Sequence, residues 1–307
     1  MNENNLISEL AKLISENQNS ETLDIDLVNT EEVIKQINQQ DHKVAEAIQK
    51  IIPNMTQSVD LIVKAFNQGG RLIYLGAGTS GRIGVLDAVE CVPTFGIEHG
   101  MVIGLMAGGE SAMYQAKEGI EDRFDEGEKD LKNIKLKSKD VVVGIAASGR
   151  TPYVIGALDY AKKVGAKTIA LSCNPKAEIA SHAEIALLPI VGPEALTGST
   201  RMKSGTAQKM VLNILSTASM IRIGKSYHNL MVDVKATNEK LHARGTRMLM
   251  QVTGINEKEA INTLKDAGGL VKLAILMALS GKNYEESTQI LNKANGFLRD
   301  AIEQSKV

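Results

Sequence analysis

The sequence predicts an α/β protein in which helices flank a parallel sheet and a small all-helical module forms the C-terminal part. Short apolar segments alternate with helical stretches that carry charged faces, an order typical of parallel α/β sheets. Glycine or turn residues bound the apolar segments, as expected for buried strands. The chain has 307 residues, which is enough for one large domain or about two of ordinary size.

Helices are predicted before the first strand and between the later strands. Residues 30–67 have the spacing of amphipathic helices, with a break near Pro53. Residues 110–132 and 152–164 are predicted as helices that connect strands. The predicted strands are residues 71–78, 101–105, 141–147, 168–173 and 184–190.

The chain after the last strand is predicted to be helical. Residues 202–223 are rich in apolar side chains and indicate a deeply buried helix, whereas residues 228–252 indicate a long and more polar one. Gly268-Gly269 separates two helices of the terminal module. Two residue pairs in this module have the spacing of a capping box: Asn256 with Glu259, and Asn283 with Glu286.

Composition excludes several classes of function. The formal net charge is -1 and aromatic residues make up 3% of the chain, so neither nucleic acid nor a membrane is an expected partner. No apolar run is long enough to cross a bilayer, and the N-terminus lacks the pattern of a signal peptide. The five histidines show no metal-ligand spacing, and Cys91 and Cys173 are too few for a disulfide framework. We therefore expect a cytoplasmic protein without a metal.

Two similar loops follow apolar strands and share the string Ser-Gly-Arg, 68 residues apart. Glycines let the backbone approach an anion, helix N-termini expose unpaired N–H groups, and hydroxyls add donors. Such loops also occur as plain strand-to-helix turns, but two of them on one sheet favour a phosphate site. The candidate ligands are Gly78, Thr79 and Ser80 in the first loop, and Ser148, Gly149 and the helix N-cap residue Thr151 in the second.

A dinucleotide site is the main alternative for the first loop. Gly76, Gly78 and Gly81 have the G-x-G-x-x-G spacing, and Glu98 lies about twenty residues further on, where a ribose-binding acid is expected. The second loop has no role in that scheme and suits a phosphomonoester better. No Gly-Lys-Ser/Thr follows at the spacing of a Walker A loop.

Longer strings carry a family resemblance. Segment 192–209, GPEALTGSTRMKSGTAQK, resembles a signature shared by the glucokinase regulatory protein and the bacterial N-acetylmuramic acid 6-phosphate etherases. The paired serine loops resemble the sugar isomerase (SIS) superfamily, whose parallel sheet is flavodoxin-like or Rossmann-like. LIYLGAGTSGR, DAVECVPTFG, IAASGRTPY and NLMVDVKATNEKL are similar to the etherases, and the similarity extends from about residue 20 to the C-terminus.

The resemblance implies a reaction and an organisation. Etherases of this family convert N-acetylmuramic acid 6-phosphate and water to N-acetylglucosamine 6-phosphate and D-lactate in cell-wall sugar recycling. They use no cofactor and act as homodimers. The implied domains are an N-terminal helical segment (1–55), an SIS sugar-phosphate domain (56–225), a long connecting helix (226–254) and a small, UBA-like helical module (255–307).

The resemblance places the catalytic acids at Glu90 and Glu121. Glu90 is assigned as the acid toward the lactate oxygen and Glu121 as its partner base or water activator. Without the resemblance, Glu121 would be read as part of a solvated acidic helix face with Glu118 and Asp122. In a straight helix Glu90 would lie roughly 15 Å from Ser80, too far for one hexose phosphate. Either that helix ends early or, as we expect, the site lies at a dimer interface.

Three residues of the shared signature are further candidates. Glu194, Ser199 and Lys203 follow the last strand and are placed to contact sugar hydroxyls or phosphate, although Lys203 also suits an ordinary helix start. Three other functions stay open beside the etherase. They are an aldose–ketose phosphate isomerase on the same fold, a non-enzymatic sugar-phosphate sensor, and a nicotinamide dehydrogenase.

Overall fold

The computed structural model describes residues 13–234 and 239–306, which form two compact units. The first unit contains the described residues up to Val89 together with Gly100–Ser216. The second contains Glu90–His99 and the described residues from Thr217 onward. The division therefore falls within two long helices, α4 (Gly78–Phe95) and α7 (Lys203–Arg222).

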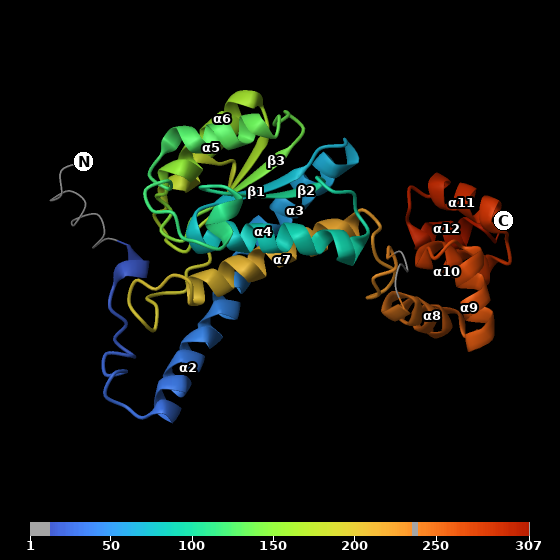
Figure 1. Ribbon diagram of the computed structural model, residues 1–307, viewed down its shortest axis with the longest axis horizontal. Helices are drawn as coiled ribbons and strands as arrows, with labels where there is room; N and C mark the ends of the chain where they lie inside the picture. Colours follow the sequence, from blue (N-terminus) through green and yellow to red (C-terminus); the bar gives the residue numbers. More distant parts are fainter. Residues whose placement is uncertain (1–12, 235–238, 307) are drawn as a thin grey trace. The chain divides into compact units, whose positions relative to one another are not determined.

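A five-stranded parallel sheet is the centre of the first unit, as predicted (Figure 1). Its strand order is β2-β1-β3-β4-β5, so the chain turns outward in opposite directions from the neighbours β1 and β3. This is a topological switch point, where open α/β sheets bind ligands. The strands are β1 (Leu72–Gly76), β2 (Val102–Met106), β3 (Val141–Ile145), β4 (Lys167–Leu171) and β5 (Ile185–Leu187).

Alternate residues of β1 show how the two faces of the sheet are covered. Ile73 and Leu75 belong to the core beneath α5 (Phe124–Asn133) and α6 (Pro152–Val164). The Tyr74 hydroxyl points the other way and donates to the Leu212 carbonyl of α7. Helices thus lie on both faces (Figure 1), which explains why the strands read as continuous apolar runs rather than alternating ones.

The N-terminal helices match the prediction for residues 30–67. They are α2 (Thr30–Gln49), capped by the Asn29 side chain, and α3 (Ile52–Asn67), which has Pro53 in its first turn. Before them, a short 3₁₀ turn, η1 (Ile14–Glu16), begins the described chain. The segment that follows is fixed by hydrogen bonds from Asn19 to the Pro193 carbonyl and from Thr22 to the Ala195 carbonyl.

The prediction of one helix over residues 110–132 is wrong. The structure has a 3₁₀ turn, η2 (Glu110–Met113), and then no helix until α5 begins at Phe124. Gly119 has φ +78° in the intervening loop, a conformation that ends helical propagation. In addition, the Glu121 carbonyl accepts from the backbone N–H of Tyr153 in α6, a tertiary bond that local sequence does not reveal.

The predicted helix over residues 228–252 is also too long. Helix α8 is Glu239–Thr253, and Tyr227 and Leu230 instead form an isolated antiparallel bridge. His228 between them has φ +50°, outside the helical region. Residues 235–238 of the proposed connecting helix lie outside the described residues.

The C-terminal module of the second unit follows the prediction closely. Helices α9 (Glu257–Asp266) and α11 (Tyr284–Lys293) each begin with the predicted capping box, and Gly268-Gly269 separates α9 from α10 (Val271–Ser280). With α12 (Leu298–Gln304) these helices enclose their own apolar core.

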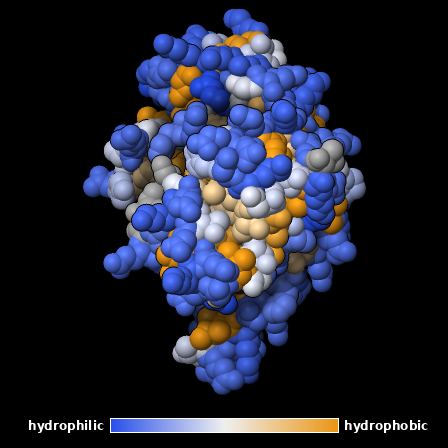
Figure 2. All heavy atoms as spheres, turned by 90° about the vertical axis from the view of Figure 1, so that its right-hand side faces the viewer, coloured by the Kyte–Doolittle hydropathy of each residue, from blue (hydrophilic) through white to orange (hydrophobic). Residues whose placement is uncertain are grey.

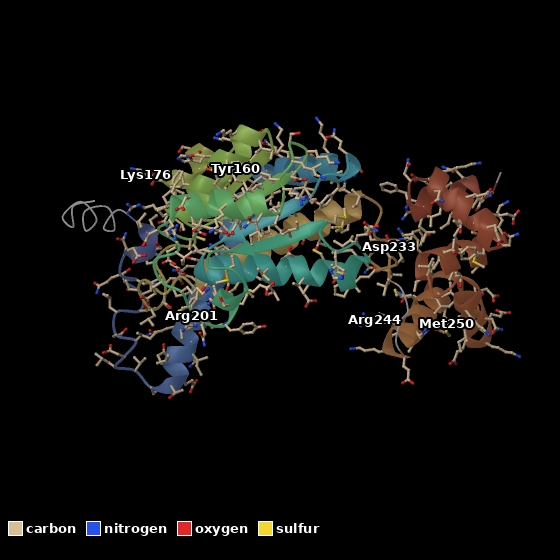
Figure 3. The ribbon with its side chains drawn as sticks, turned by 45° about the horizontal axis from the view of Figure 1, so that its top comes forward. Tyr160, Lys176, Arg201, Asp233, Arg244 and Met250 are labelled. Carbon is tan, nitrogen blue, oxygen red and sulfur yellow. The ribbon has the colours of Figure 1, made fainter. Side chains whose placement is uncertain are left out.

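A buried lysine ties three loops of the second unit together. The Lys272 ammonium donates to the carbonyls of Gly224 and Gly296 and to Asp233, which also pairs with Lys225 (Asp233 is labelled in Figure 3). Burial lowers the pKa of Lys272, and the negative charge of Asp233 opposes that shift.

Hydrophilic residues dominate the face in Figure 2, interrupted by a few hydrophobic patches. Among the helices of the described chain, none is both long and apolar enough to traverse a bilayer.

Candidate functional site

A cavity of about 410 Å³ lies where β1 and β3 end. This volume is in the range of small-molecule sites, and the position is the switch point of the sheet. Both serine loops contribute to it, as the sequence predicts. The cavity is lined by Leu13, Glu16, Ala77, Gly78, Thr79, Ser80, Glu121, Asp122, Ala146, Ala147, Ser148, Arg150, Thr151, Pro152 and Thr200.

The first loop supplies backbone donors as well as hydroxyls. The N–H of Gly81 bonds to the Ala77 carbonyl, so the N–H groups of Gly78, Thr79 and Ser80 precede the hydrogen-bond ladder of α4. All three residues line the cavity. The positive end of the helix dipole and these unpaired donors favour an anion at this point.

Ser80 is connected to α7 through Gln208. The hydroxyl of Ser80 donates to Gln208 Oε1 at 3.0 Å, and both side chains are almost fully buried. Gln208 Nε2 has no hydrogen-bond partner among the described residues. Rotating this amide by half a turn would make Nε2 the donor to Ser80 and release the serine proton toward the cavity.

The second loop presents hydroxyls at the start of α6. Ser148 and Thr151 line the cavity, and Thr151 occupies the predicted N-cap position without making a side-chain capping bond. Gly149 does not line the cavity. Its φ is +74°, and a β-carbon there would collide with Ala177, so glycine is needed for the turn itself.

Glu121 stands beside the second loop. The hydrogen bond from the Tyr153 N–H to its carbonyl holds it against the first turn of α6, at 3.0 Å. Partial desolvation raises the pKa of Glu121, and the charges of Asp122 and Glu118 raise it further. The cavity therefore has a carboxyl group able to exchange a proton nearer to neutral pH than an ordinary glutamate.

Glu90 does not line this cavity. It lies on α4, which is continuous from Gly78 to Phe95, so the helix does not end early. Glu90 is ten positions after Ser80 on this helix, which corresponds to roughly 15 Å along the axis. The Glu90 side chain is exposed to solvent.

The three signature candidates also lie outside the cavity lining. Glu194 is fully buried and accepts from the backbone N–H groups of Lys203 and Ser204, which caps α7. The Lys203 ammonium is buried and donates to Gln40 of α2; burial lowers the pKa of this lysine, while Glu194 opposes the shift. Ser199 belongs to the turn before α7. Its neighbour Thr200 lines the cavity instead, ahead of the exposed Arg201 (Figure 3).

Several residues that line the cavity were not predicted from the sequence as site residues. Leu13 and Glu16 belong to a polar N-terminal stretch without a motif, and Asp122 reads as a solvated charge. Arg150 was visible only as part of the repeated Ser-Gly-Arg string. Thr200 lies inside the signature segment, one residue from the candidate Ser199.

Other chemistries find less support in the geometry. Glu98, the acid of the dinucleotide alternative, precedes β2 and so lies at the amino end of that strand, away from the edge where ligands bind. Cys173 is buried, and burial raises the pKa of its thiol to about 12. Within residues 13–234 and 239–306, no group of three His, Cys, Asp or Glu side chains is placed to hold a metal ion.

Family models match two parts of the chain. The glucokinase regulatory protein N-terminal SIS domain matches residues 54–162, and the SIS domain matches residues 123–218. The curated relatives are similar over nearly the full length. N-acetylmuramic acid 6-phosphate etherase 2 of Vibrio cholerae is 60% identical over 299 residues, 97% of each chain. The N-acetylmuramic acid 6-phosphate etherase of Brucella anthropi is 58% identical over 306 residues, 100% of each chain.

Solved structures show more distant similarity. A phosphoheptose isomerase from Neisseria gonorrhoeae has a TM-score of 0.47 and 18% identity, covering 62% of this chain and 97% of that one. The NanR protein of Vibrio vulnificus, complexed with ManNAc-6P, has a TM-score of 0.45 and 14% identity, covering 66% of this chain and 67% of that one.

Proposed function

Because this chain belongs to the family of N-acetylmuramic acid 6-phosphate etherases, we propose that it cleaves the D-lactyl ether of N-acetylmuramic acid 6-phosphate. The products are N-acetylglucosamine 6-phosphate and D-lactate, and the role is recycling of cell-wall amino sugars in the cytoplasm. The observation that carries the proposal is the meeting of both serine loops and Glu121 in one cavity.

The two serine loops bind the 6-phosphate in this proposal. Backbone N–H groups of Gly78, Thr79 and Ser80 and the hydroxyls of Ser148 and Thr151 surround the cavity from neighbouring strands. Neutral donors and helix N-termini stabilise a dianion without a metal. The phosphate thereby fixes the position of the sugar relative to Glu121.

Elimination followed by hydration accounts for the need for two carboxyl groups. In the ring-opened aldehyde, the Glu121 carboxylate removes the C2 proton while Glu90 donates a proton to the lactate oxygen, so that the C3–O bond breaks. Water then adds to C3 of the unsaturated aldehyde. Glu90 takes a proton from that water and Glu121 returns its proton to C2, which restores both groups. The raised pKa of Glu121 suits a group that takes up and releases a proton in each turnover.

A homodimer with the site at the subunit interface is the second part of the proposal. Glu90 is exposed on α4. Its distance from Ser80 along the helix axis is longer than one hexose phosphate can span. Leu86 and Val89, on the same helix, are 52% and 61% exposed, which is suited to burial by a second copy. In this arrangement Glu90 of one subunit acts in the active site of the other subunit.

Substitution of the loop serines tests the phosphate site. Ser80→Ala and Ser148→Ala should each raise KM for N-acetylmuramic acid 6-phosphate by roughly tenfold, because each removes a hydroxyl that donates to a charged oxygen of the phosphate. The Ser80 hydroxyl becomes such a donor when the Gln208 amide rotates and donates to the serine oxygen. Lactate release by the wild type separates the etherase from other sugar-phosphate proteins. Sugar interconversion without lactate would indicate an isomerase, and binding without turnover would indicate a sensor.

A further inference from the structure

The N-terminal segment contributes a carboxylate to the cavity that neither the loops nor the proposed chemistry requires. Glu16, at the end of η1, lines the cavity together with Leu13. It is half-buried, and its neighbour Ser15 is only 2% exposed. Glu16 is therefore part of the wall of the site rather than a free surface charge.

A chain of hydrogen bonds through the buried side chains of Ser15 and Asn174 connects Glu16 to the start of the second serine loop. Asn174 is 1% exposed and donates through Nδ2 to the Ala147 carbonyl, at 2.9 Å, and to Ser15 Oγ, at 3.2 Å. Its Oδ1 accepts from the Ser15 N–H. The Ser15 hydroxyl in turn donates to Glu16 Oε1 at 3.4 Å. Asn174 and Ser15 thus act as positioning residues for the Glu16 carboxylate.

The other carboxylate oxygen faces the loop before α7. A β-carbon added at Gly198 would lie 3.4 Å from Glu16 Oε2. Thr200, two residues further along, lines the same cavity. Glu16 is therefore held between the second serine loop and the segment that leads into α7.

Charge balance indicates what Glu16 does there. Three acidic residues, Glu16, Glu121 and Asp122, and one basic residue, Arg150, line a cavity whose loops are suited to a phosphate dianion. An extra carboxylate weakens the binding of an anion unless it accepts hydrogen bonds from the ligand. An ionised carboxylate can only accept, and its hydrogen bonds to O–H or N–H donors are among the stronger ones in proteins.

We infer that Glu16 recognises a hydroxyl or amide N–H of the sugar and so discriminates sugar phosphates from other phosphates. The inference rests on the proposed function for the class of substrate. It assigns Glu16 to the sugar rather than to the phosphate or to the proton transfers.

Binding measurements on two probes test this assignment. Calorimetry with Glu16→Ala should show roughly 10- to 100-fold weaker binding of N-acetylglucosamine 6-phosphate, the loss expected for a hydrogen bond to a charged group. Inorganic phosphate should bind unchanged or more tightly, because a repulsive charge is gone. Glu16→Gln retains an acceptor oxygen and should recover part of the loss.

Controls separate recognition from a structural role. Glu46→Gln removes an exposed carboxylate of α2 and should change neither affinity. Ser15→Ala, which loosens the Glu16 carboxylate, should weaken only the sugar phosphate, and by less than Glu16→Ala. Equal weakening of both probes by Glu16→Ala, or no change in either, would overturn the inference. If the wild type released no lactate but Glu16→Ala still weakened only the sugar phosphate, the etherase reaction would be rejected and the role of Glu16 would stand. If the wild type did not bind the sugar phosphate, both proposals would be rejected.

Discussion

The surroundings of Glu121 raise the pKa of its carboxyl group. Desolvation beside α6 is the main cause of its raised pKa, and the like charges of Asp122 and Glu118 add to it. If Glu121 is the base of the elimination step, protonation of this residue sets the acid limb of the pH–rate profile. The charge on Asp122 therefore influences where that limb falls.

Asp122→Asn should move the acid limb of kcat/KM to lower pH. Removing the neighbouring negative charge lowers the pKa of Glu121, so the base stays ionised in more acidic solution. The profile of lactate release against pH measures the shift. Asp125→Asn, at an exposed position outside the cavity, should leave the limb in place. An acid limb that does not move in Asp122→Asn would contradict the role of Glu121 as base.

Gln208→Met should weaken the binding of inorganic phosphate about fivefold, the value of one ordinary hydrogen bond. The substitution removes the amide that, once rotated, donates to the Ser80 oxygen and directs the serine proton toward the phosphate. In a Ser80→Ala background it should have no further effect, since the hydroxyl is already absent. Ser219→Ala removes another buried hydroxyl of α7 that has no partner among the described residues, and it serves as the control. Additive losses in the double variant would argue against this coupling.

Among the individual residues of the site, those that belong to a local motif could be predicted from the sequence. Both serine loops could be found because glycines and hydroxyls after a strand have a clear physical use. Glu16 could not be found, because tertiary hydrogen bonds, among them those between Asn174 and Ser15, bring the N-terminal segment to the cavity. In the structure Glu194 caps α7 and Lys203 donates to Gln40. Their role as ligands stays a prediction.

At the scale of elements, the start of α7 depends on one buried side chain. Glu194 satisfies two backbone N–H groups of this helix and opposes the loss of charge on Lys203. Lys203 donates to Gln40, which connects the helix start to α2. The cap thus fixes the segment that carries Thr200 into the cavity wall.

Glu194→Gln should lower the free energy of unfolding by roughly 1–3 kcal/mol. The amide has one acceptor oxygen for two N–H groups and leaves the desolvated Lys203 less compensated. Urea unfolding measures the change. Glu98→Gln, at an exposed position, is the matched control. Stability equal to the wild type would show that water or another group replaces the cap.

Elements with repeated local signals were predicted well. The five strands and the two capping boxes are defined by short-range patterns, and each is present. The predictions failed where tertiary contacts override helical composition. The Glu121–Tyr153 backbone bond and the bridge between Tyr227 and Leu230 each occupy a segment that sequence alone indicates as helix.

At the scale of the whole molecule, the proposed dimer makes each active site depend on two chains. Glu121 lines the cavity of its own chain, and Glu90 would come from the partner. Two inactive variants could then complement each other, because a mixed dimer contains one site with both glutamates intact.

Mixing Glu90→Gln and Glu121→Gln after joint refolding should restore about a quarter of the wild-type activity, since half of the random dimers are mixed and each has one intact site. Each variant refolded alone is the control. If both glutamates of a site came from one chain, every site in a mixed dimer would carry one substitution. The mixture would then be as inactive as its components.

Lactate release from N-acetylmuramic acid 6-phosphate tests the central claim most directly. The wild type should release one lactate for each N-acetylglucosamine 6-phosphate formed. Glu90→Gln and Glu121→Gln should lose at least about a hundredfold in kcat, as expected for general acid–base groups, while still binding the sugar phosphate. No lactate from the wild type, or full activity in either variant, would contradict the account.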